Sequence, residues 1–281
     1  MIALRSAGAA LPVALFIVAL GLGRQPAWSE DHAPNAAAPA GSNCQRSAFR
    51  AVIDVGHTVE VPGAISARGV PEYQFNLRLA QQIKQTLVDD GFGKTALLIT
   101  ATAPTPGLFE RAARANALRA DLFISIHHDS VPDYLLETWD YDGQQNHFSD
   151  RFTGYAIFVS NDNPRRARSL EFGRFLGKEL QADGQHFTPH YTLPLMGRYR
   201  RPLLDAKAGI YRFDDLVVLQ STQMPAVLFE AGSIVNRQEE LELATPERIA
   251  LTSAAVAAAV QDFCAAHSPT RDNRIGKHHK M

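Results

Sequence analysis

Short apolar runs rich in β-branched residues alternate along this chain with longer segments of helical periodicity. The strand-like runs cover residues 51–55, 96–100, 122–126, 155–160 and 226–229, and the helix-like segments cover 72–90, 108–118, 169–180 and 246–263. Strands that alternate with helices form βαβ units, in which consecutive strands pair in parallel. The sequence therefore predicts an α/β fold, a single domain with a mostly parallel central sheet flanked by helices.

Two long stretches lack this alternation. Residues 131–153 carry several aromatic and acidic side chains, and residues 185–213 carry arginines and prolines. Long irregular loops inside a compact domain are usually functional or disordered. We expect a peptide-binding wall from the first stretch. Autoinhibition, with Glu137 or Asp140 reaching the active site, is an alternative hypothesis.

The length and net charge of the chain limit its possible fold size and partners. The chain has 281 residues, 46% of them hydrophobic, which is enough for one sizeable core. The formal net charge of -1 gives no overall attraction to nucleic acid or to an anionic membrane. We therefore expect no nucleic-acid partner, and we expect a monomer.

The N-terminal segment has the pattern of a secretory signal peptide. Arg5 precedes an apolar run over residues 9–22, and Ala27 and Ser29 are small residues at the positions that a signal peptidase requires. We predict a signal peptide over residues 1–29 and a secreted protein, in the periplasm; an uncleaved membrane anchor is the alternative.

The remaining boundaries follow from composition. Residues 30–48 are rich in Ala, Pro and Gly and predict a disordered linker. A catalytic domain is expected over 49–266, and a disordered polar tail over 267–281. Cys44 and Cys264 bracket the domain, so either a disulfide between its ends or two free thiols is compatible with the sequence.

Four polar residues stand at the ends of these elements. His57 and His127 follow strand-like runs, Glu72 begins a helix-like segment, and Glu230 ends a strand-like run. Two imidazoles and a carboxylate with an open fourth position form a catalytic zinc site, and a further carboxylate can act as the base. Each residue could instead have a purely structural role. The histidines could be hydrogen-bonded, Glu72 could interact with the helix dipole, and Glu230 could form a salt bridge. His128 competes with His127 as a ligand.

The segments around these residues resemble a known family. They read VIDVGH, PGAISARGVPE, SIHHDS and MPAVLFEAGSIVNRQEE, and over residues 49–264 the chain is similar to the zinc-dependent N-acetylmuramoyl-L-alanine amidases of the amidase-3 family. The resemblance implies Zn²⁺ as cofactor, with His57, Glu72 and His127 as its ligands. It also implies that Glu230 is the general base.

Further residues are candidates for supporting roles. Asn236 resembles the asparagine that follows the family's catalytic glutamate, although Ser233 stands where an aromatic residue is expected. Asp54 could hydrogen-bond a liganding imidazole. Substrate-binding candidates on the second irregular stretch are Arg198, Arg200 and Arg201, because arginine pairs well with the carboxylates of stem peptides. A solvated basic loop is the alternative for these arginines.

The resemblance implies a peptidoglycan hydrolase. Its members cleave the amide bond between the lactyl group of N-acetylmuramic acid and L-alanine of the stem peptide, and some are regulated, so a protein activator is a candidate partner. Two other classes remain open on the residues alone. One is a zinc peptidase acting within wall peptides, and the other is an inactive cell-wall-binding module.

Overall fold

The computed structural model describes residues 44–101 and 104–267. The expected signal peptide, residues 30–43 of the expected linker and the tail after His267 lie outside these residues. Residues 44–48, also expected to be disordered, instead form a turn in which Arg46 donates to the Asp90 carbonyl at 2.9 Å. The described part contains a seven-stranded sheet with the order β2-β1-β3-β9-β6-β8-β7 and a separate two-stranded ribbon. Its strands are β1 (Ala51–Val55), β2 (Ala96–Leu98), β3 (Leu122–Asp129), β4 (Glu137–Tyr141), β5 (Gln144–Phe148), β6 (Ala156–Val159), β7 (Leu203–Asp205), β8 (Ile210–Arg212) and β9 (Ala226–Ser233).

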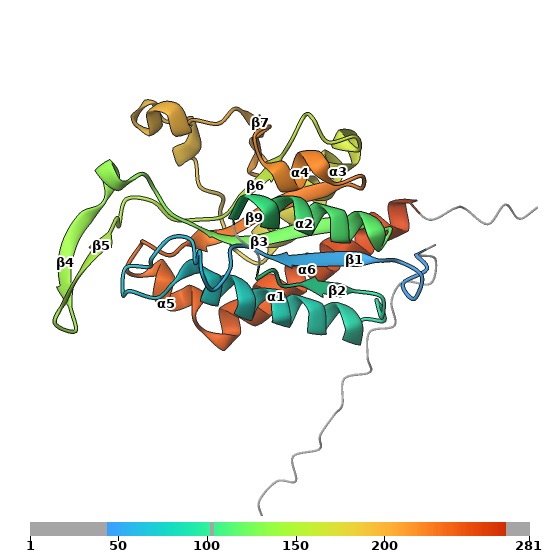
Figure 1. Cartoon of the computed structure of the whole chain (residues 1–281), viewed down its shortest axis with the longest axis horizontal. Helices are drawn as coiled ribbons and strands as arrows, with labels where there is room; N and C mark the ends of the chain where they lie inside the picture. The colour runs from blue at the N-terminus through green and yellow to red at the C-terminus, as the bar shows by residue number, and fades with distance from the viewer. Residues whose placement is uncertain (1–43, 102–103, 268–281) are drawn as a thin grey trace, which may run out of the picture. The chain divides into compact units, whose positions relative to one another are not determined.

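Helices cover both faces of the large sheet (Figure 1). They are α1 (Glu72–Asp89), α2 (Pro104–Ala117), α3 (Arg166–Ala182), α4 (Val217–Ser221), α5 (Glu239–Leu243) and α6 (Pro246–His267). Helices α1, α3 and α6 pack together on one face, and α2 packs with α4 on the other. The predicted α/β fold with a mostly parallel central sheet is confirmed.

The strand pairing places the carboxyl ends of three central strands at one edge. Strands β1, β3 and β9 are parallel neighbours, whereas β6 runs antiparallel to β9. Both β3 and β9 extend beyond their apolar runs, and His127 is in register with Glu230. These two residues thus lie inside paired strands rather than after them, because the ladder between β3 and β9 continues past the apolar segment.

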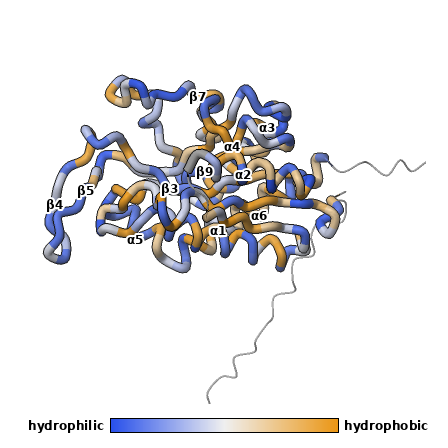
Figure 2. Tube along the Cα trace, viewed as in Figure 1, coloured by the Kyte–Doolittle hydropathy of each residue, from blue (hydrophilic) through white to orange (hydrophobic). Residues whose placement is uncertain are grey.

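The core has two parts, one on each face of the sheet. Buried side chains alternate between them along each strand: Ile53 and Ile124 face α1, α3 and α6, whereas Val52 and Phe123 face α2 and α4. Figure 2 shows the hydrophobic segments gathered in the sheet and its covering helices, and a hydrophilic ribbon of β4 and β5. This alternation is the period of two expected of a sheet that is covered on both faces.

Helix α6 is long and apolar enough to cross a membrane by length and composition alone. In the structure it packs against α1 and α3, and side chains such as Val256 and Val260 are fully buried in the core. Near its end Cys264 forms a disulfide with Cys44, with an S–S distance of 2.04 Å. Of the two states that the sequence allowed, the structure has the disulfide.

The stretch 131–153, expected to be irregular, contains the hairpin of β4 and β5. Its turn is Asp142 and Gly143, both with positive φ, and Trp139 anchors one strand by donating its indole N–H to the Ala67 carbonyl at 2.7 Å. The hairpin projects from the body of the domain (Figure 1). The alternation of apolar and polar residues is weak in β4 and β5 because most of their residues are exposed.

The stretch 185–213, also expected to be irregular, extends the sheet at its edge. After two short 3₁₀ turns, His190–Thr192 and Pro194–Tyr199, strand β7 pairs with β8 and β8 with β6. The strands have only three residues each, too few to show a period in the sequence. The first of the 3₁₀ turns places Tyr191 beside Phe158 and Tyr211.

Candidate metal centre

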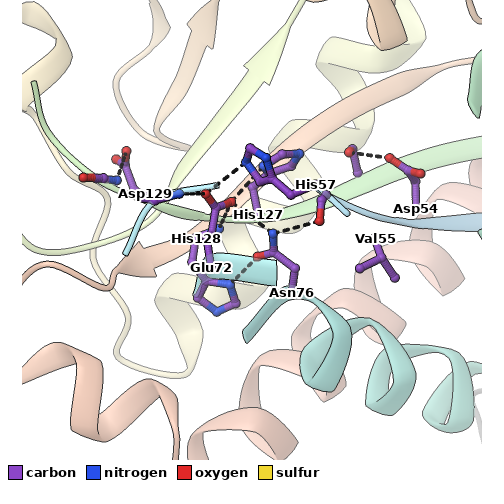
Figure 3. Close-up of polar contacts among 12 residues, drawn as sticks. Asp54, Val55, His57, Glu72, Asn76, His127, His128 and Asp129 are labelled. Carbon is purple, nitrogen blue, oxygen red and sulfur yellow. Dashed lines mark hydrogen bonds and ion pairs between the residues drawn. The ribbon is translucent and has the colours of Figure 1, made fainter. Parts of the chain in front are cut away.

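Three of the four predicted residues meet at the carboxyl edge of the sheet. His57 follows β1, Glu72 is the first residue of α1, and His127 lies near the end of β3. The Glu72 carboxylate bridges the two rings, with Oε2 at 3.0 Å from His57 Nε2 and Oε1 at 3.0 Å from His127 Nδ1. One donor atom from each residue can be chosen so that all lie within 4.8 Å of one another. Figure 3 shows the three side chains converging.

Two glycines beside the three residues have no room for a side chain. A Cβ at Gly56 would overlap the His127 ring, and a Cβ at Gly63 would overlap both Glu72 and His57. Gly63 also has φ +82, and His57 itself has φ 65, a left-handed conformation that is uncommon outside glycine. Two nitrogen donors and one oxygen donor held this closely fit the ligand set of a catalytic zinc ion.

The Glu72 side chain is held in its ionised form. Its burial raises the carboxyl pKa, but hydrogen bonds from His127 and His57 outweigh burial and hold that pKa well below the ordinary value. A divalent cation requires its carboxylate ligand to be ionised, and Glu72 is held in this form between two imidazole nitrogens.

His128 faces away from this centre and into the helix layer. It is buried, and its Nδ1 lies 2.8 Å from Asn76 Oδ1. The Asn76 amide nitrogen donates to Glu72 Oε1 at 3.0 Å and to the Gly56 carbonyl at 3.3 Å. Asn76 Oδ1 is therefore an acceptor, and His128 Nδ1 carries the proton. Of the two adjacent histidines, His127 is the one beside Glu72.

Beneath the His57 loop lies a buried ion pair that involves Asp54. The Asp54 carboxylate accepts from Arg111 at 2.8 Å and from the Ser125 hydroxyl at 2.7 Å. Arg111 also donates to the carbonyls of Val55 and His57. Burial raises the Asp54 pKa, an effect that Arg111 and Ser125 partly offset. Asp54 was expected to bond an imidazole; it instead bonds Arg111, which donates to the backbone carbonyl of His57.

Glu230 lies beside His127 on the neighbouring strand. Burial raises its carboxyl pKa well above the ordinary value, and the carboxylates of Asp129 and Glu72 raise it further. Its Oε2 is buried and has no hydrogen-bond partner among the described residues. Such a carboxyl group holds a proton readily, as a general base must after proton transfer.

A polar network around Asp129 lies between the end of β3 and the first 3₁₀ turn. The Tyr191 hydroxyl donates to Asp129 Oδ1 at 2.6 Å, and His190 Nε2 lies 3.6 Å from Asp129 Oδ2. Burial raises the pKa of Asp129 to about 7. The pKa of Tyr191 rises well above its ordinary value, mainly through burial and further through Asp129 and Glu230.

Two cavities adjoin this edge of the sheet. The first, which we call the apolar cavity, has a volume of about 330 Å³ and includes both imidazoles in its wall. Its apolar lining comes from one loop, two helices and β9: Val61, Leu108, Leu216, Val217, Val218 and Leu228. The second, which we call the arginine cavity, has a volume of about 920 Å³ and is lined by Tyr134, Tyr191, Tyr199, Phe213, Arg198 and Arg201.

The three predicted arginines differ in position. Arg198 is exposed, donates to the Tyr199 hydroxyl at 2.8 Å and lines the arginine cavity. Arg201 also lines it, stacks on Phe213 and has a buried Nε without a partner in the described part of the chain. Arg200 is exposed and is not part of that lining.

Asn236 is buried where β9 leads into α5. Its Oδ1 accepts from the backbone amides of Gln238 at 3.1 Å and Glu239 at 2.9 Å. These bonds cap the start of the following helical segment, which is a common use of asparagine. The side chain also borders a third cavity, on the side of Trp139 and Arg237.

The residues that support the centre were not among those predicted from the sequence. Asn76 could have been found, because it lies one helical turn after Glu72 and shares its face of α1. Arg111 and Tyr191 gave no such signal, since each reaches the site from an element whose packing the sequence does not specify.

Comparison with known proteins agrees with this geometry. A family model described as N-acetylmuramoyl-L-alanine amidase matches residues 51–262. The uncharacterized protein YqiI of Bacillus subtilis is 28% identical over 195 residues, which are 69% of this chain and 75% of YqiI. The amidase AmiC of Neisseria meningitidis is 27% identical over 221 residues, covering 75% of this chain and 52% of AmiC. The match thus spans about half of AmiC.

A solved structure shares the fold. The N-acetylmuramyl-L-alanine amidase Ami1 from Mycobacterium smegmatis superposes with a TM-score of 0.59 at 18% identity, over 78% of this chain and 98% of Ami1. The family match includes the strands and helices that carry all four predicted site residues. The chain therefore belongs to the amidase-3 family of N-acetylmuramoyl-L-alanine amidases.

Proposed function

We propose that the protein hydrolyses the amide bond between the lactyl group of N-acetylmuramic acid and L-alanine in peptidoglycan, with zinc held by His57, Glu72 and His127. The observation that carries this proposal is the convergence of two imidazoles on one ionised carboxylate, in a chain of this family. Glu230, beside them with its raised pKa, is the proposed general base.

Zinc at this site would supply a Lewis acid and lower the pKa of a water molecule that it binds. Glu230 takes the proton of the attacking water and returns it to the leaving nitrogen of L-alanine. Its position next to His127 brings the carboxyl group to the edge where the ligand set lies. A carboxyl group in a low-dielectric setting is suited to both halves of this proton transfer.

The arginine cavity is the proposed site for the stem peptide. Arg198 and Arg201 line it together with tyrosine and phenylalanine side chains. Stem peptides carry free carboxylates, and guanidinium groups pair with carboxylates through parallel hydrogen bonds. Arg200 and Asn236 are weaker candidates, because Arg200 lies outside this lining and Asn236 caps a helical segment.

The proposed setting is the periplasm. It rests on the signal-peptide pattern of residues 1–29 and is compatible with the disulfide, since such bonds persist in oxidising compartments. We also propose that the domain acts as a monomer and that a protein activator is a candidate partner. Glu137 and Asp140 are exposed on the projecting hairpin and, within the described residues, contact none of the ligand set. A peptide-binding wall formed by that hairpin is therefore the better proposal.

The decisive experiment is mass spectrometry of purified peptidoglycan digested by the protein. Beside it run a chelator-treated sample and the variant Glu230→Ala. We expect intact stem peptides with free N-terminal L-alanine, lost in both controls. Cleavage inside the stem would assign the protein to the wall peptidases instead, and unchanged peptidoglycan would exclude hydrolysis by the protein alone.

A further inference from the structure

The two cavities at the carboxyl edge differ in charge. In the apolar cavity, Arg111 and Asp54 are buried and bonded to each other, so neither offers a free charge. Asp215, exposed at its rim, has no ion pair among the described residues and is negative. A carboxylate-bearing ligand would therefore meet apolar walls and a like charge in this cavity, at a cost in desolvation and repulsion.

The arginine cavity has the opposite character. Arg198 is exposed there, and the buried Nε of Arg201 lacks a partner in the described part of the chain. Asp133 is the one acid in its lining. Carboxylates are stabilised by such guanidinium groups, while aromatic neighbours exclude water from the pairs.

Tyr191 links the end of β3 to the arginine cavity. It lines that cavity and donates to Asp129, two residues after His127 on β3. The imidazoles of His57 and His127, in contrast, form part of the wall of the apolar cavity. The proposed ligands thus border the apolar cavity, whereas the arginine cavity begins at Ser130, directly after β3.

The two sides of the proposed scissile bond differ in the same way. The acyl side is a muramoyl group, which is uncharged and presents the methyl groups of its lactyl and N-acetyl substituents. The amine side is a peptide with free carboxylates.

We infer that the two cavities fix the direction in which the substrate binds. The apolar cavity takes the muramoyl group, and the arginine cavity takes the stem peptide. This inference rests on the proposed function and adds to it the assignment of each half of the substrate. Leu108 and Val61, each 38% exposed at the apolar cavity, are its specificity-determining residues on the acyl side.

The test compares variants on three soluble substrates. These are a muramoyl tripeptide, the same compound with its stem carboxylates amidated, and a lactoyl tripeptide that lacks the sugar ring. Leu108→Asp places a carboxylate in the apolar cavity, Leu108→Met is its apolar control, and Val61→Asp repeats the change from the other wall. Arg198→Glu reverses a charge in the arginine cavity. Zinc content and unfolding midpoint are measured for each.

Leu108→Asp should lower kcat/KM on the muramoyl tripeptide by about tenfold, the scale of one mismatched group in an apolar pocket. The loss should persist on the amidated stem and largely vanish on the lactoyl tripeptide. Arg198→Glu should show the reverse pattern, with a loss that disappears when the stem is amidated.

Two results would overturn the assignment. One is a Leu108→Asp defect that disappears on the amidated stem, because the peptide would then occupy the apolar cavity. The other is an equal defect on the lactoyl and muramoyl substrates. Failure of the unaltered protein to release L-alanine peptides from any substrate would instead refute the proposed function itself, and the assignment would fall with it.

Discussion

Breaking the ion pair between Arg111 and Asp54 should damage both stability and metal binding. Arg111 is 3% exposed and Asp54 is fully buried. Removing Asp54 would leave a guanidinium group buried without its counter-ion, which typically costs about 3–5 kcal/mol. Asp54→Ala should therefore lower the free energy of unfolding by that amount, measured on the metal-free protein by urea denaturation.

The same pair should act on the ligand set through the His57 carbonyl. Arg111→Met removes the donors that hold the carbonyls of Val55 and His57, so the left-handed residue that presents the imidazole loses its support. Outer partners of metal ligands commonly change affinity by about 10–100-fold. We expect a zinc affinity lower by that factor in chelator competition, even at temperatures where the variant is folded.

Arg114→Met is the matched control on the same helix. Arg114 is 44% exposed and pairs with Glu110 one turn away at 3.7 Å, an arrangement worth about 0.3–0.5 kcal/mol. Combining Asp54→Ala with Arg111→Met should cost less than the sum of the single changes, because neither charge is then left alone. Strict additivity, or an Asp54→Ala cost as small as that of Arg114→Met, would refute the reasoning.

Three further predictions concern the base, a buried histidine and the disulfide. Glu230→Gln should lower kcat by about 10²–10⁴-fold with unchanged zinc affinity in chelator competition; a comparable loss of zinc would place Glu230 among the ligands. Burial lowers the pKa of His190 from 6.5 to about 4, so only the unfolded chain gains a proton between these values. Stability should fall by about 3 kcal/mol as pH drops through that window, and His190→Phe should flatten this dependence in urea unfolding at pH 7 and pH 4.5; an equally steep profile would exclude His190. Replacing Cys44 and Cys264 with serine opens a loop of 220 residues and should cost about 5 kcal/mol by the chain-entropy relation; a loss below about 1 kcal/mol in the same assay would contradict that relation here.

The alternation of strands and helices was predictable because each central strand is buried on both faces. Such strands are short, β-branched and apolar, as residues 51–55 and 122–126 show. The hairpin was not predicted, since its strands have no core to face. Its turn residues, Asp142 and Gly143, are a typical hairpin signal, but they lie outside any apolar period.

The convergence of the candidate ligands was predictable for a different reason. His57, Glu72 and His127 belong to three elements whose ends the parallel topology brings to one edge. The contacts of Arg111 depend on the packing of α2 across the opposite face, and those of Tyr191 depend on a 3₁₀ turn. Neither arrangement follows from a local pattern in the sequence.

The two glutamates at this edge show how the fold separates their proposed roles. Both are carboxyl groups near His127, yet Glu72 receives hydrogen bonds from two imidazoles, whereas Glu230 has a buried oxygen with no partner among the described residues and a pKa that the carboxylate of Asp129 raises further. The first setting stabilises the ionised form, and the second stabilises the protonated form. A ligand must remain ionised, and a base must accept a proton. The hydrogen-bond partners supplied by the fold, rather than the residue type, therefore favour Glu72 as ligand and Glu230 as base.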